Sequence, residues 1–211
     1  MISIMKKLMF VCIAILCVPF IAVGQNLDNI DFISPFNDGI CSIKKGNAWA
    51  FIDAQGSFII DFREDLVPTK IGEDYYPIFR DNRCLVSQKI DGIAYFGYID
   101  KLGKTVIKPE FLNATNFDDG LAIVLKLNKE KLGENEVLGK PVVSYSYTEV
   151  IINPKGEIIE YLTDPIHISL TAKNFRTPPL ITSKLISGNL VSVVDKNNKM
   201  SIKRIYSQQS Y

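Results

Sequence analysis

A four-residue turn that recurs along the chain is the feature that most constrains its fold. It occurs at residues 53–56 (DAQG), 100–103 (DKLG) and 153–156 (NPKG). An Asp or Asn at the first position bonds to nearby backbone, and a Gly at the fourth tolerates the left-handed conformation. Short apolar segments with strand character flank each turn. The sequence therefore predicts about three antiparallel hairpins.

A second pattern precedes each hairpin, and it defines the repeat. Residues 36–43 (FNDGICSI), 79–86 (FRDNRCLV) and 117–124 (FDDGLAIV) each combine an aromatic residue, a tight turn and a strand. Residues 186–193 (ISGNLVSV) are a weaker copy, followed by a turn beginning at Asp195. We place repeat units near 36–62, 79–111 and 117–161. A degenerate unit at 186–206 is what the cap of an array would resemble.

The predicted fold class is all-β, an array of antiparallel β-hairpin repeats. Three shapes fit this pattern: a twisted meander, a small propeller or a stacked solenoid. The region 163–184 is interrupted by prolines, so we expect an irregular crossing segment there.

The stretch 96–111 (FGYIDKLGKTVIKPEF), followed by 117–124, resembles the WG-repeat family. That family's unit is a Trp-Gly-Tyr-Ile-Asp strand, a Gly-Lys turn, a Val-Ile-x-Pro strand and then Phe-x-x-Gly-Leu-Ala-x-Val. The similarity is close over 96–124, partial over 36–62 and faint over 148–161 and 186–206. The dipeptide that names the family is replaced in turn by Trp49-Ala50, Phe96-Gly97 and Glu149-Val150. The resemblance implies an antiparallel β-repeat protein without catalytic residues.

Residues 1–24 have the composition of a secretory signal peptide. Lys6 and Lys7 precede an uncharged apolar run, and Ala22 and Gly24 stand at −3 and −1 of a cut before Gln25. A retained membrane anchor is the alternative, because the run is nearly long enough to span. We predict cleavage and export to the periplasm, the outer surface or the medium. Residues 25–211 then form one β-repeat domain with no stable membrane span.

Charge excludes one class of partner. Removing residues 1–24 leaves 187 residues with 22 basic and 23 acidic side chains, without a basic stripe. Such a chain lacks the electrostatic footprint of a nucleic-acid-binding protein. Residues 126–136 mix both signs, and we interpret them as a solvated loop.

No residues form a recognisable catalytic, metal or cofactor motif. His167, the sole histidine, lies between two Ile residues, which is typical of a packed or edge-strand residue. Neighbouring acids on a strand point to opposite faces, so three acidic pairs do not converge naturally; these pairs are Glu64-Asp65, Glu73-Asp74 and Asp118-Asp119. We therefore predict a protein that is not an enzyme. The alternative is an envelope hydrolase that acts on glycan or peptide.

Tyrosines outside the repeat cores are the candidate partner contacts: Tyr75, Tyr76, Tyr145 and Tyr147. Exposed tyrosines on loops suit contact with a partner, although spacing by two suits one face of a strand equally. The insert 126–147 lengthens a hairpin, which would project from the array. These features predict a binding or interaction module for a protein or glycan of the cell envelope.

Cys41 and Cys84 are the cysteines that remain after cleavage. They hold the same place in successive units, where the third unit has Ala122. Equivalent positions three strands apart in one sheet lie about 14 Å from each other at roughly 4.8 Å per strand. A disulfide needs Cα atoms within about 7 Å. We predict two free, buried thiols; only units stacked directly on one another would allow a bridge.

Overall fold

The computed structural model describes residues 27–135, 139–195 and 197–206, which contain sixteen β-strands and no helix. The strands are β1 (Phe32–Ile33), β2 (Ile40–Lys45), β3 (Ala48–Asp53), β4 (Phe58–Arg63), β5 (Thr69–Ile71), β6 (Asp74–Tyr76), β7 (Cys84–Ile90), β8 (Ile93–Ile99), β9 (Thr105–Ala114), β10 (Ala122–Asn135), β11 (Lys140–Ile152), β12 (Ile158–Tyr161), β13 (Ile166–Ile168), β14 (Lys184–Ser187), β15 (Leu190–Val194) and β16 (Met200–Arg204). The all-β prediction is confirmed. In the described ranges no helix is long and apolar enough to cross a membrane. The predicted signal peptide lies outside them.

Successive strands are neighbours in the sheets, so the hydrogen-bonded path is a meander. β1 to β4 form one sheet, β7 to β12 a second in chain order, and β14 to β16 a third. β13 adds to the second sheet by pairing with β11, and β5 pairs with β6 alone. The described residues close into neither a barrel nor a propeller, so the propeller alternative is wrong.

The recurring turn has the same hydrogen bonds in every unit. Asp53 Oδ1 accepts bonds from the backbone nitrogens of Gln55 (2.9 Å) and Ser57 (2.8 Å). Asp100, Asn153 and Asp195 accept equivalent bonds two and four residues ahead. The fourth turn position has positive φ each time; its occupants are Gly56, Gly103, Gly156 and Asn198. The three predicted hairpins are confirmed, and the degenerate unit has the same turn.

The fourth unit is a strand shorter than the others. In the first three units two strands separate the tight turn from the Asp or Asn turn. In the fourth, β15 alone runs from the tight turn beside Leu190 to the turn at Asp195. This missing strand explains why only part of the repeat is visible in the sequence there.

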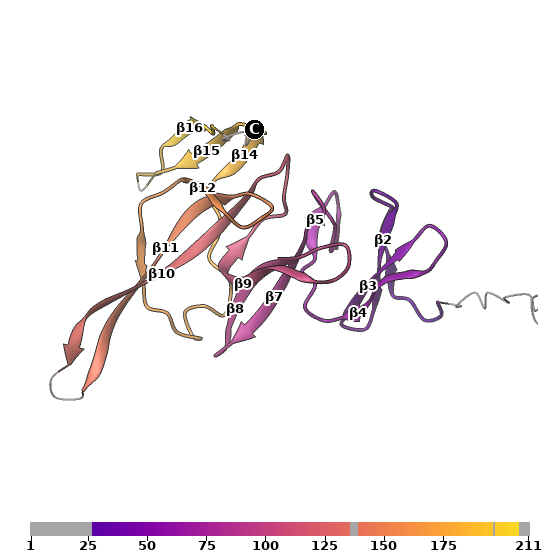
Figure 1. The fold of residues 1–211 in the computed structure, drawn as a ribbon, viewed down its shortest axis with the longest axis horizontal. Helices are drawn as coiled ribbons and strands as arrows, with labels where there is room; N and C mark the ends of the chain where they lie inside the picture. Colours follow the sequence, from indigo (N-terminus) through magenta and orange to yellow (C-terminus); the bar gives the residue numbers. More distant parts are fainter. Residues whose placement is uncertain (1–26, 136–138, 196, 207–211) are drawn as a thin grey trace, which may run out of the picture.

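Consecutive units pack face to face, in layers that follow one another in Figure 1. The face of the first unit that carries Trp49 and Phe51 packs against the face of the second that carries Cys84 and Val86. The next two junctions pair Phe96 and Tyr98 with Ala122 and Val124, and Ile123 and Ile151 with Val191 and Val193. The meander is therefore also a stack, because both faces of the inner units are apolar and buried.

Strand β9 shows how the meander becomes a stack. Phe111 pairs with Phe96 of β8 on one side and with Lys126 of β10 on the other, and Ala114 then pairs with Val124. Because β9 exchanges partners along its length, the sheet turns over on itself between units.

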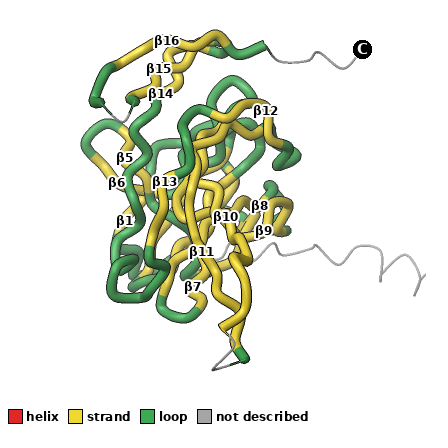
Figure 2. Tube along the Cα trace, turned by 90° about the vertical axis from the view of Figure 1, so that its left-hand side faces the viewer, coloured by secondary structure: helices red, strands yellow, loops and turns green. Residues whose placement is uncertain are grey.

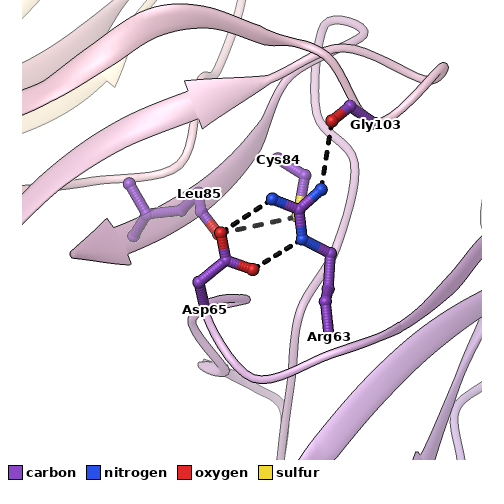
Figure 3. Close-up of polar contacts among 5 residues, drawn as sticks. All are labelled: Arg63, Asp65, Cys84, Leu85 and Gly103. Atoms are coloured by element: carbon purple, nitrogen blue, oxygen red, sulfur yellow. Dashed lines mark hydrogen bonds and ion pairs between the residues drawn. The ribbon is translucent and has the colours of Figure 1, made fainter.

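Polar contacts at the junction of the first two units add to the apolar packing. The guanidinium of Arg63 donates to both carboxylate oxygens of Asp65, and its Nη1 donates to the carbonyl oxygen of Gly103 at 3.0 Å (Figure 3). A Cβ on Gly103 would lie 3.6 Å from the side chain of Ile60, and one on Gly156 would lie 3.3 Å from Ile107. The turns at Gly103 and Gly156 thus rest on the third strand of the preceding unit.

Cys41 and Cys84 are free thiols with no exposed surface, in two separate clusters of the core. The geometric reason differs from the expected one. The units do stack directly, but Cys84 faces the first unit, whereas Cys41 lies on the far face of that unit, in a cluster with Leu27 and Ile30. The sheet of the first unit therefore stands between them. Stacked sheets lie about 10 Å apart, which is still too far for a disulfide.

The insert is a long two-stranded hairpin of β10 and β11 that extends beyond the other described strands (Figure 2). The predicted solvated loop is wrong for residues 126–135, because these pair with β11 except at an irregularity between Lys131 and Gly133. The crossing segment, residues 163–184, is irregular as predicted except for β13 and the start of β14.

Candidate partner-binding groove

A groove of about 450 Å³ opens between the β7–β8 hairpin and the β10–β11 hairpin. We call it the hairpin groove; it is lined by Ile90, Tyr95, Pro109, Glu110, Phe111, Lys126 and Leu127. It forms because Phe111–Lys126 is the outermost pair between β9 and β10. Beyond it the two strands diverge, and in the described residues the β9-facing edge of β10 has no pairing strand from Leu127 outward.

The lining combines an apolar floor with charged groups at its margin. Phe111 is buried at its base, and Leu127 and Tyr95 are half-buried. Lys126 Nζ donates a hydrogen bond to Tyr161 Oη at 3.1 Å and lies 5.4 Å from the centroid of that ring. Glu110 is exposed and supplies the opposite charge. An apolar floor with a few placed polar groups is typical of a binding site.

The predicted contacts Tyr145 and Tyr147 both lie near this groove. Lys129 Nζ is 6.0 Å from the centroid of the Tyr145 ring. The pKa of Tyr95 is raised, first by burial and then by Tyr145 and Asp91. Tyr95 and Tyr147 pack in one apolar cluster. The pKa of Tyr147 is raised by burial and next by the charge of Glu149.

Tyr147 also lines a second hollow of about 300 Å³ with residues of the crossing segment. Leu127 of the hairpin groove lies opposite Tyr147 in the β10–β11 ladder. Both side chains belong to one apolar cluster with Phe175. The two hollows therefore border the same cluster.

The other predicted pair, Tyr75 and Tyr76, lies on β6, away from this groove. Tyr75 is 60% exposed, whereas Tyr76 is 6% exposed and stacks on Phe32 with ring centroids 6.0 Å apart. Successive strand residues point to opposite sides, so the two cannot share a surface. Tyr76 is a core residue, and its prediction as a surface contact is corrected.

Catalytic groups do not converge at either hollow. His167 on exposed β13 has Nδ1 3.4 Å from Ser144 Oγ, and neither residue lines either hollow. Asp65 is paired with Arg63, and Asp118 and Asp119 form a tight turn. Across the described ranges no three His, Cys, Asp or Glu side chains gather as metal ligands.

Sequence reasoning missed Glu149, a carboxylate that is 2% exposed. Its Oε1 accepts bonds from the backbone nitrogen (2.7 Å) and hydroxyl (2.9 Å) of Thr182, and its Oε2 accepts one from the Ser183 nitrogen (3.0 Å). The available signal was its position, since Trp49 and Phe96 occupy the same place in other units. A charge at an apolar repeat position indicates a specific anchor, here for the crossing segment.

Residues 96–129 match the family described as WG containing repeat. No curated protein and no solved structure matches the chain. The WG containing repeat thus extends from β8 through β9 into β10, which includes the strand that joins two layers and five residues of the hairpin groove.

Proposed function

We propose that the protein is an exported, non-enzymatic binding module that takes an extended segment of a cell-envelope protein into the hairpin groove. The observation that carries this proposal is the groove beside an unpaired strand edge. An extended peptide can add to such an edge through its main chain, while pockets select its alternate side chains. The composition of residues 1–24 supports export.

The groove chemistry favours a peptide over a glycan. Recognition of a hydroxyl-rich sugar ring requires several placed polar groups around it. The lining supplies mostly apolar surface, one carboxylate and one ammonium. A peptide with apolar side chains at alternate positions and mixed charge matches these groups. The proposed function includes no hydrolytic step, and neither His167 nor the acidic pairs singled out in the sequence are among the residues that line the groove.

Site-specific photo-cross-linking tests the proposal. A photoreactive phenylalanine analogue replaces Ile90, which is 45% exposed at the groove, and in a matched variant replaces Leu102, which is 87% exposed on a turn outside it. We expect one envelope protein to cross-link at residue 90 and not at residue 102, and Lys126→Glu to reduce its yield at least several-fold. Equal products from both positions would refute the groove. If the protein sediments with purified envelope glycan and no envelope protein cross-links at residue 90, the ligand is a glycan and not a peptide.

A further inference from the structure

The outer edge of β16 is an unprotected strand edge at the end of the array. β16 pairs with β15 on one side, and no described strand pairs with its other side. Met200 is 73% exposed and Ile202 is 67% exposed. From this edge we infer that two copies of the chain associate by pairing β16 with β16 of the second copy, antiparallel and across a two-fold axis.

The hydrogen-bond pattern shows which groups the edge offers. The Asp195 nitrogen donates to Lys199, and the Ile205 nitrogen donates to Asn189, so odd-numbered residues of β16 direct their backbone groups toward β15. The backbone groups of Met200, Ile202 and Arg204 consequently point away from the sheet. Every second N–H and C=O along β16 is available for another strand.

The sequence of β16 is complementary to itself in one register. With Ile202 opposite Ile202 of the second copy, Met200 lies opposite Arg204 and Ser201 opposite Lys203. The residues with outward backbone groups then face each other, and antiparallel pairs of this kind exchange two hydrogen bonds. No like charges meet, which would otherwise destabilise the pairing. The aliphatic stem of Arg204 can cover Met200.

β16 lacks two of the devices that blunt an edge strand, a bulge and a proline. β14, the other edge of the same sheet, has a register irregularity between Leu185 and Ser187, whereas all five pairs of β16 with β15 are regular. The ammonium of Lys203 lies on the opposite face, 3.4 and 3.3 Å from the carbonyl oxygens of Tyr161 and Leu162. The other face presents Met200, Ile202 and Arg204. In the proposed register Arg204 lies opposite Met200, so its charge does not meet the same charge of the second copy.

The two-fold axis gives a direct test, because residue 202 would face itself. Ile202→Lys and Ile202→Glu each place like charges opposite each other, while a mixture of the two variants places opposite charges there. Sedimentation velocity of the purified protein over a concentration series should show a reversible dimer, since the contact is small. We expect each single variant to remain monomeric and the equimolar mixture to recover the dimer.

Two further variants separate the edge from general surface effects. Ile202→Pro removes one outward N–H and no bond to β15, so it should abolish the dimer without unfolding the sheet. Leu102→Lys, at an apolar residue outside this edge that is more exposed than Ile202, should leave the dimer unchanged. A wild-type protein that stays monomeric throughout would overturn the inference. So would a dimer that survives Ile202→Pro, or a mixture that fails to recover it.

Discussion

The backbone nitrogen of Pro109 lies over Gly97, at 2.6 Å from the position that a Cβ of residue 97 would occupy. Between Ile107 and Phe111, β9 has two residues more than the facing stretch of β8. In the first unit, where Ala50 takes the place of Gly97, β4 has one residue more than the facing stretch of β3. In the third unit, where Val150 takes this place, β12 and the residue after it have no extra residue opposite β11. The longer the bulge, the smaller the residue beneath it.

Gly97→Ala is expected to lower the free energy of unfolding by about 1–3 kcal/mol, the usual cost of overpacking a core. The new methyl would meet backbone of Lys108 and Pro109, which cannot move without disturbing the ladder. Urea denaturation measures the change. Gly188→Ala is the control, because its methyl would meet only the side chain of Asp119 at 3.3 Å. Equal stability of the two variants would contradict this account of the bulge.

Glu149→Gln is expected to loosen the crossing segment. A carboxylate accepts all three bonds from Thr182 and Ser183, whereas the amide nitrogen of Gln would face a donor. Leaving a buried donor without an acceptor costs about 1–3 kcal/mol. Tryptic cleavage at exposed Lys173 and Arg176 should accelerate several-fold.

Glu160→Gln, on the exposed β12, is the matched control for that experiment and should leave the cleavage rate unchanged. If Glu149→Gln behaved like this control, Glu149 would not anchor the segment.

The hairpins could be predicted because each depends on local chemistry. Asp53 and Asp100 accept hydrogen bonds from backbone nitrogens within four residues. The residue types that this turn needs are therefore visible in a four-residue stretch of the sequence. The stacking could not be predicted in the same way. It depends on β9 changing partners at Phe111, and the spacing of apolar residues is identical whether neighbouring units lie in one plane or face each other.

The groove was beyond sequence reasoning for a related reason. Its lining comes from three separated segments, near Ile90, Pro109 and Lys126, and it exists because two strands diverge. Tyr145 was predicted as a partner contact because it lies in the insert that breaks the repeat spacing. Tyr76 was misplaced because an aromatic pair gives no sign of which member faces the core.

Cys84 is expected to resist alkylation in the folded protein. Burial raises the pKa of its thiol, and Arg63 only partly opposes this, so the unreactive protonated form persists. Iodoacetamide at pH 8 should modify neither cysteine in the native state. In denaturant without reductant it should add two groups to the chain from Gln25 onward, as mass spectrometry would show. A bridged pair would leave the protein unmodified.

The same raised pKa predicts that stability falls at high pH. The unfolded thiol ionises near pH 8.5, so above that pH the unfolded state binds fewer protons than the native state. The stabilisation is complete below about pH 8.5 and declines by at most about 2 kcal/mol by pH 10. Cys84→Ala, which copies Ala122 of the third unit, should reduce this decline in urea denaturation at pH 8 and pH 10. If Cys84→Ala left the decline unchanged, the loss of stability at high pH would come from titratable groups other than Cys84.

Shortening the β10–β11 hairpin separates its role in binding from its role in folding. Lys129 lies opposite Tyr145, so replacing residues 130–144 by Asn-Gly would join the two strands with a two-residue turn. Leu132 (63% exposed) and Val142 (44% exposed) contribute little burial, so the free energy of unfolding should change by less than about 1 kcal/mol. The cross-link from residue 90 should weaken, since the free edge of β10 beyond Lys129 is lost while the groove lining remains.

Replacing only the exposed side chains of Leu132 and Val142 by Ser is the control, because it keeps the edge and should keep the cross-link. An undiminished cross-link in the shortened protein would show that the partner does not pair with β10.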